Sequence, residues 1–162
     1  FIALFVWIGA AQEASMAQMK SALSGIPVAR AMLTDFRTLS PQDALRRAVE
    51  LLLSGSQHDF PVLDGERVVG VMTRADLLVA LAQRDQDTRV EDVMRRECET
   101  VDATEMLETA FRRFQTCHCE TLPILRAGAL VGLVSLDNVG EFVAIQTALE
   151  SAKASRRKVV GA

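Results

Sequence analysis

The chain has 162 residues, enough for one compact domain or for two half-size units that share a core. Its apolar fraction of 49% and charged fraction of 24% are typical of folded globular proteins, and a net charge of −3 excludes a general attraction to nucleic acid or anionic lipid. Three cysteines, Cys98, Cys117 and Cys119, are too few and uneven for a disulfide framework, so we expect reduced thiols in a reducing compartment.

An uncharged apolar run, Phe1 to Ala11, opens the chain. It lacks the basic start and cleavage site of a signal peptide and is shorter than the about 20 residues that cross a bilayer. Two interpretations stay open: the end of a membrane helix, which its all-round hydrophobicity favours, and an amphipathic helix packed on the domain. Helical spacing continues from Gln12 to Leu23, so we expect an N-terminal helix within 1–25 and a chain that is part of a longer protein.

Two segments of the chain align without a gap at a constant offset of 62 residues, beginning at Met32 and Met94. A gap-free match over this length indicates an internal repeat. We place the first copy at 26–86 and the second at 87–149. The basic tail at 150–162 is expected to be a frayed, solvated end.

The residue pattern of each copy predicts a short extended entry segment, a helix, two strands and a second helix. Ser40 with Pro41 and Asp43, and Asp102 with Glu105, resemble capping boxes and predict where the first helices begin. Apolar runs around a Gly-containing turn then predict paired strands. The expected strands are 60–63, 68–72, 122–125 and 130–134, and the expected second helices are 74–82 and 136–148.

These segments resemble the CBS family. The resemblance rests on FPVLDG at 60–65, LPILRAG at 122–128, GVMTRAD at 70–76 and GLVSLDN at 132–138, and it extends over about residues 26–149. It implies an α/β (α+β) fold of two CBS repeats, each a small sheet packed on helices, forming a pseudo-twofold pair. It also implies homodimers formed through CBS helices, and adenosine nucleotides bound in clefts between the copies.

The first 32 residues are also similar to the end of the membrane part of site-2-protease-type (M50-like) zinc metalloproteases that carry C-terminal CBS pairs. The His-Glu-x-x-His motif of those enzymes is absent from this sequence. This resemblance implies a parent membrane protease, with zinc only in the absent protease domain. It places the module at the cytoplasmic face of the membrane.

The Thr/Ser-x-x-Asp/Asn motif of each copy admits two interpretations. One is a capping box, in which Thr73 and Asp76 satisfy free amides of a helix. The other is a nucleotide site, because free amides at a helix start attract phosphate and a carboxylate accepts hydrogen bonds from ribose hydroxyls. The resemblance favours the second interpretation and implies a first site of Thr73, Arg74, Asp76, Thr100, Val101, Thr121 and Leu122, and a weaker second site of Thr38, Leu39, Asp59, Phe60, Ser135 and Asn138.

The sequence departs from the family pattern at these sites. Asn138 replaces the ribose-binding Asp, which turns a charge-assisted hydrogen bond into a neutral one. Asp59 and Thr121 stand where family members that hold several phosphates can place a basic side chain, and Glu120 adds negative charge. We expect at most one good site, at Thr73 and Asp76, with AMP or another adenosine compound favoured over ATP.

Cys117, His118, Cys119 and Glu120 form a cluster of potential zinc ligands. Alternating ligands on so short a loop cannot all reach one tetrahedral ion, and spacing identifies no acid-base partner for a thiol nucleophile, so we expect neither a metal site nor an enzyme. The sequence therefore predicts a regulatory nucleotide-binding module. The alternative is a ligand-free module that dimerises its parent protein through exposed helix faces.

Overall fold

The computed structural model describes residues 21–117 and 119–160. The apolar run and most of the expected N-terminal helix therefore lie outside the described residues, and residues 21–23 are helical. Within the described ranges, no helix combines the length and the hydropathy that crossing a membrane requires.

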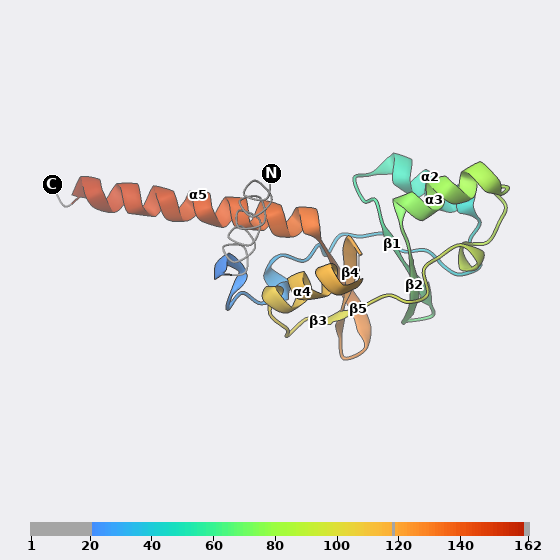
Figure 1. The fold of residues 1–162 in the computed structure, drawn as a ribbon, viewed down its shortest axis with the longest axis horizontal. Coiled ribbons are helices and arrows are strands. Elements are labelled where there is room, and N and C mark those ends of the chain that lie inside the picture. Colours follow the sequence, from blue (N-terminus) through green and yellow to red (C-terminus); the bar gives the residue numbers. More distant parts are fainter. Residues whose placement is uncertain (1–20, 118, 161–162) are drawn as a thin grey trace, which may run out of the picture.

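The described chain forms two units, each with a small sheet and two longer helices (Figure 1). The mixed α and β fold expected from the sequence is confirmed. The elements are η1 (Val28–Arg30), α2 (Leu45–Ser54), β1 (Phe60–Asp64), β2 (Arg67–Met72) and α3 (Arg74–Gln83), followed by η2 (Val90–Asp92), β3 (Val101–Asp102), α4 (Leu107–Cys117), β4 (Thr121–Arg126), β5 (Ala129–Ser135) and α5 (Leu136–Val160).

The two sheets have equivalent topology. In the first unit β1 and β2 are antiparallel, and Leu39 pairs in parallel with Val62 of β1. In the second unit β3 is parallel to β4, which is antiparallel to β5, and Val101 pairs with Ile124. Each sheet therefore has an extended entry residue, then the first strand, then the second strand.

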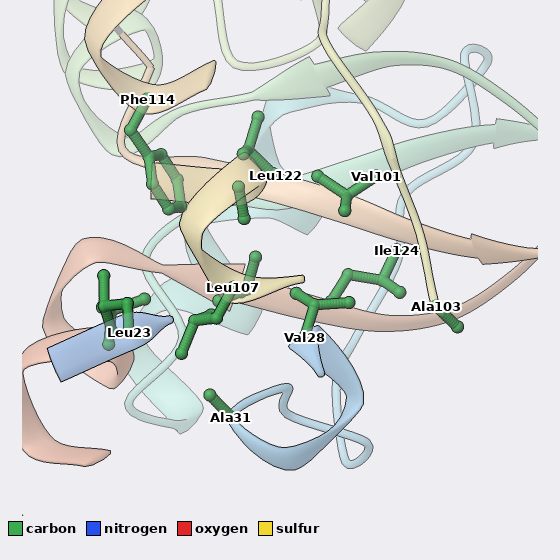
Figure 2. Close-up of a cluster of buried hydrophobic side chains, with 12 residues drawn as sticks. Leu23, Val28, Ala31, Val101, Ala103, Leu107, Phe114, Leu122 and Ile124 are labelled. Atoms are coloured by element: carbon green, nitrogen blue, oxygen red, sulfur yellow. The ribbon is translucent and has the colours of Figure 1, made fainter. Parts of the chain in front are cut away.

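The hydrophobic cores exchange segments between the two copies. The core around α2, β1, β2 and α3 also contains Val90 and Met94 from the start of the second copy. Figure 2 shows the reciprocal arrangement, in which Leu23, Val28 and Ala31 join the cluster around α4, β4 and β5. Neither unit completes its core from residues of its own copy alone.

Backbone hydrogen bonds fix this exchange in both directions. The Val28 amide donates to the Glu105 carbonyl at 2.9 Å, and the Leu107 amide donates to the Ile26 carbonyl at 2.7 Å. Segment 88–90 makes the equivalent pair of bonds to residues 43–45, at 2.8 and 2.9 Å. The start of each first helix is therefore bonded to the entry segment of the other copy.

This bonding corrects the expected helix starts. The sequence predicted that the first helix begins at Pro41, but α2 begins at Leu45, and α4 likewise begins at Leu107. The preceding residues instead form turns, in which the Ser40 amide donates to Asp43 Oδ2 at 2.7 Å. The Asp43 carbonyl and the Leu45 amide bond to the crossing segment, so the helix does not extend toward the N-terminus.

A second crossing explains the glycine of each signature motif. After η2, Arg95 of one crossing segment pairs with Val71 in β2. After η1, Leu33 of the other crossing segment pairs with Leu133 in β5. A Cβ atom at Gly70 would lie 2.6 Å from the Arg95 carbonyl oxygen, and one at Gly132 would lie 2.9 Å from that of Leu33. Glycine is required because backbone passes directly over these positions.

The prediction of a frayed C-terminal tail is wrong for the described residues of that segment. Helix α5 does not stop near residue 148 but continues to Val160, and it runs out beyond the two units (Figure 1). From residue 141 to 160 the sequence contains no Gly or Pro and is rich in Ala, Lys and Arg, which are strong helix formers.

We expect Gly70→Ala to lower the free energy of unfolding by about 2 kcal/mol, because the added methyl group must displace the crossing backbone. The matched control is Gly140→Ala in exposed α5, where a Cβ meets nothing within 4 Å. That change should raise stability by about 0.5 kcal/mol through helix propensity. Urea unfolding measures both, and a Gly70→Ala protein as stable as the wild type would contradict the crossing.

Candidate functional site

Equivalent residues of the two copies meet at Asp59 and Thr121, which are 62 residues apart. The Thr121 hydroxyl donates to Asp59 Oδ2 at 2.7 Å, and the Asp59 side chain is buried, with 8% of the residue exposed. Because the repeat offset is also 62 residues, this contact joins equivalent positions of the two copies. Asp59 thus links the two units through a buried carboxylate.

The other oxygen of Asp59 binds the start of helix α3. The Arg74 amide, the first of that helix, donates to Asp59 Oδ1 at 3.1 Å. A carboxylate is favourable there because it meets a free amide and the positive end of the helix dipole. The first amide of α3, one of those that the predicted first site would offer to a phosphate, is therefore engaged by this carboxylate.

The first motif is a capping box whose carboxylate is also paired with arginine. The Asp76 amide donates to Thr73 Oγ1 at 3.1 Å, and the Thr73 hydroxyl donates back to Asp76 Oδ2 at 2.6 Å. Arg95 binds both oxygens of Asp76, with Nε at 2.6 Å from Oδ2 and Nη2 at 3.1 Å from Oδ1. The oxygens that would accept ribose hydroxyls are therefore engaged by side chains of the protein.

The pKa of Asp76 reflects these partners. Partial burial acts to raise the pKa of this carboxyl group, but the hydrogen bonds from Arg95 and Thr73, with the Arg95 charge, hold it below its ordinary value. The pKa of Arg95 is raised in turn, chiefly by its hydrogen bond to Asp76. Asp76 is therefore ionised and paired at neutral pH.

The second motif has the same cap without the arginine. The Ser135 hydroxyl donates to Asn138 Oδ1 at 2.6 Å, and the Asn138 amide donates to Ser135 Oγ at 3.2 Å. The residue equivalent to Arg95 is Leu33, which is 42% exposed and offers no charged group. The difference between Arg95 and Leu33 makes the two motifs unequal.

A cleft of about 560 Å³ lies beside the second motif, between the copies. One wall comes from the loop before β1, and the other comes from the loop before β4 and the start of α5. The lining residues are Leu33, Asp35, Ser56, Gln57, His58, Asp59, Glu120, Thr121, Leu133, Ser135, Leu136, Asp137, Asn138 and Glu141.

The structure separates the residues that the sequence analysis assigned to sites. Asp59, Thr121, Ser135 and Asn138 line the cleft together. The remaining assigned residues are not among its lining. The side chains of Leu39 and Phe60 lie in the first core and those of Val101 and Leu122 in the second, Thr38 and Arg74 are exposed, and the Thr100 carbonyl accepts a hydrogen bond from Arg113.

Several cleft residues were missed by the sequence analysis, among them Leu33, Asp35, His58 and Glu141. Leu33 and Asp35 reach the cleft because the first entry segment crosses to the second sheet, which local patterns do not reveal. A signal was available in the repeat itself, since the 62-residue offset places Leu33 opposite Arg95.

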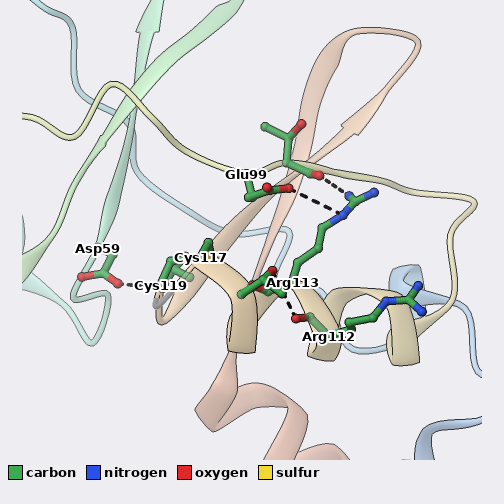
Figure 3. The surroundings of a disulfide bond; sticks show 9 residues. Asp59, Glu99, Arg112, Arg113, Cys117 and Cys119 are labelled. Atoms are coloured by element: carbon green, nitrogen blue, oxygen red, sulfur yellow. Dashed lines mark hydrogen bonds and ion pairs between the residues drawn. A yellow bond between two sulfur atoms is a disulfide. The ribbon is translucent and has the colours of Figure 1, made fainter.

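The cysteine cluster contains a disulfide, which corrects the expectation of reduced thiols. Cys117 and Cys119 are joined, with their Cα atoms 5.2 Å apart, close to Asp59 and the contact between the copies (Figure 3). Cys98 is a free cysteine, and burial raises the pKa of its thiol. Over residues 21–117 and 119–160, no group of three His, Cys, Asp or Glu residues is placed to hold a metal ion.

Comparison with known sequences and structures identifies relatives. The profile of the CBS domain matches residues 28–83 and 90–144. The CBS domain-containing protein YhcV of Bacillus subtilis (strain 168) is 31% identical over 123 residues, which are 75% of this chain and 86% of that protein. Inosine-5'-monophosphate dehydrogenase of Korarchaeum cryptofilum (strain OPF8) is 28% identical over 109 residues, but the match spans 22% of that enzyme.

A solved structure supports the same fold. Protein MJ1225 of Methanocaldococcus jannaschii superposes with a TM-score of 0.69 at 16% sequence identity, with 79% of this chain and 51% of that chain covered. At this identity the likeness concerns the fold alone.

We expect a double-mutant cycle of Asp76→Asn and Arg95→Met to give a coupling free energy of about 1 kcal/mol at pH 7. The ion pair is bidentate, which strengthens it, but it is partly exposed to solvent, which weakens it. The pKa of Asp76 is lower in the folded protein than its ordinary value of 3.8. The coupling is therefore fully present above that value and is lost as the pH falls through the folded pKa. Urea unfolding at pH 7 and pH 3 measures it, and equal coupling at both would contradict the pairing.

Proposed function

The chain belongs to the CBS domain family, with two copies in tandem, and from this premise we propose that it is a regulatory module that binds an adenosine compound between its copies. The cleft beside Ser135 and Asn138 carries the proposal. Its volume of about 560 Å³ falls within the range of small-molecule sites. Its walls come from both copies, so a ligand there contacts both units at once.

The second motif is the better candidate for the ligand site. The sequence favoured Thr73 and Asp76, but Arg95 binds both oxygens of Asp76, and Asp59 binds the first amide of α3. A ligand at that motif would have to displace both partners. Leu33 imposes no such competition at Asn138, so we propose one ligand per chain, held at the start of α5.

Ligand binding regulates by favouring one arrangement of the two copies. The Thr121 hydroxyl and the Asp59 carboxylate join the copies and also line the cleft. A ligand shifts the balance between two arrangements by as much as its affinities for them differ. We therefore propose that ligand occupancy is transmitted through this contact, which also reaches α3 through the Arg74 amide.

Dimerisation is the second candidate function, and exposed apolar side chains favour it. On the adjacent helices α2 and α3, Leu53 is 80% exposed, Leu78 53% and Val79 57%. A contiguous apolar patch marks an interaction surface, and we propose that these three side chains belong to one. We propose that this surface forms a homodimer, either together with ligand binding or as the whole function.

We also propose that the module is attached to a membrane-bound zinc metalloprotease at its cytoplasmic face. The resemblance of residues 1–32 to M50-like enzymes supports this attachment. The test is the genomic reading frame around the segment that encodes this chain. An in-frame His-Glu-x-x-His motif upstream would support the proposal, and a frame without one would overturn it.

We expect an adenosine compound to raise the unfolding midpoint, because a ligand of the native state stabilises it by mass action. AMP, ADP, ATP, adenosine and S-adenosylmethionine are the test set. Ser135→Ala with Asn138→Ala should abolish the shift, and calorimetry should give one ligand per chain. Loss of the shift in Thr73→Ala with Asp76→Ala instead would move the site to the first motif, and no shift with any compound would leave dimerisation as the function.

For the dimer, we expect Leu78→Glu to convert the protein to a monomer, since a buried unpaired charge disfavours an apolar interface. The control is Ile145→Glu on α5, also exposed at 59% but outside the α2 and α3 surface. Sedimentation velocity of both variants checks this. A wild-type monomer, or a Leu78→Glu dimer, would contradict the proposal.

A further inference from the structure

The cleft beside the second motif is lined by acidic side chains. Five of its lining residues are carboxylates, namely Asp35, Asp59, Glu120, Asp137 and Glu141. Of the described residues that line it, none is Lys or Arg, and His58 is the single residue that can carry a positive charge. A concave surface lined by one sign of charge concentrates its field within the cleft.

This charge reaches beyond the cleft itself. Asp59 and Glu120 both contribute to the raised pKa of Arg95, which is not among the residues that line the cleft. Glu120 and Glu141 are exposed, whereas Asp59 is buried and less screened by solvent. The cleft therefore has a negative potential from both its rim and its interior.

Two of the backbone amides that could offset this charge for a phosphate already have partners. At the start of α5, the Leu136 amide donates to the Glu120 carbonyl at 3.1 Å and the Asn138 amide donates to Ser135 Oγ at 3.2 Å. A phosphate entering the cleft would meet five carboxylates and neither Lys nor Arg among the described lining residues.

We infer that this cleft selects adenosine compounds without phosphate and prefers those that carry a positive charge. The inference rests on the proposed function and specifies its ligand class. A metal ion is a weaker occupant, because no three acidic, His or Cys residues of the described ranges are placed to hold one. The cleft volume of about 560 Å³ suits a nucleoside-sized organic ligand.

Two pairs of compounds test the inference by calorimetry at about 0.15 M salt. Adenosine and AMP differ by a phosphate that carries nearly two negative charges, and adenosine should bind at least about tenfold more tightly. S-adenosylmethionine and S-adenosylhomocysteine differ by one methyl group and one positive charge, and the charged sulfonium compound should bind about tenfold more tightly.

Charge-neutralising variants show whether the cleft carboxylates cause these preferences. Glu120→Gln with Glu141→Gln should reduce both ratios by about threefold or more, since two charges of the rim are removed with little change of shape. The control is Glu150→Gln on the same helix, exposed and outside the cleft lining. It lies nine residues, or about 14 Å, beyond Glu141, which exceeds the screening length.

The outcomes separate this inference from the proposed function. Tighter binding of AMP than of adenosine, or ratios unchanged in Glu120→Gln with Glu141→Gln, would overturn the inference and leave an adenosine-binding module. Binding of none of the four compounds would overturn the proposed function, and the inference with it. Both ratios in the expected direction, reduced by the cleft variant and unaffected by Glu150→Gln, support it.

Discussion

The exchange of entry segments between the two copies is the constraint on which the rest of the structure depends. Each segment supplies apolar side chains to the other unit's core and backbone hydrogen bonds to its first helix, then pairs with its last strand. This crossing sets where α2 and α4 begin and requires glycine at Gly70 and Gly132. The two copies therefore form one cooperative unit, because neither has a complete core alone.

The same crossing gives two equivalent motifs different chemical surroundings. It carries Arg95 to the first motif and Leu33 to the second, so one motif is closed by an ion pair while the other borders a cleft. Asp59 adds to the difference, because it caps α3 and joins the copies through Thr121. The repeated backbone thus provides two geometrically related positions, and the side chains of Arg95, Leu33 and Asp59 make their chemistry different.

The negative charge of the cleft beside the second motif limits which ligands the proposed site can hold. The family resemblance suggests nucleotides, whereas the carboxylates of this cleft disfavour phosphate. Among the departures seen in the sequence, Asp59 and Glu120 indicated weaker binding of several phosphates, and Asn138 indicated a weaker hydrogen bond to ribose. The structure brings all three to one cleft and adds Asp35 and Glu141, so the acidic character belongs to the site as a whole.

The sequence by itself determined the repeat and the order of helices and strands, because these depend on local spacing and on apolar periodicity. It misplaced the starts of α2 and α4 and the end of α5, and it favoured the motif that Arg95 closes. Only the tertiary structure decided which segment crosses to which core and which cleft stays open. Those outcomes depend on pairing between backbone and side chains far apart in the chain, which no local pattern specifies.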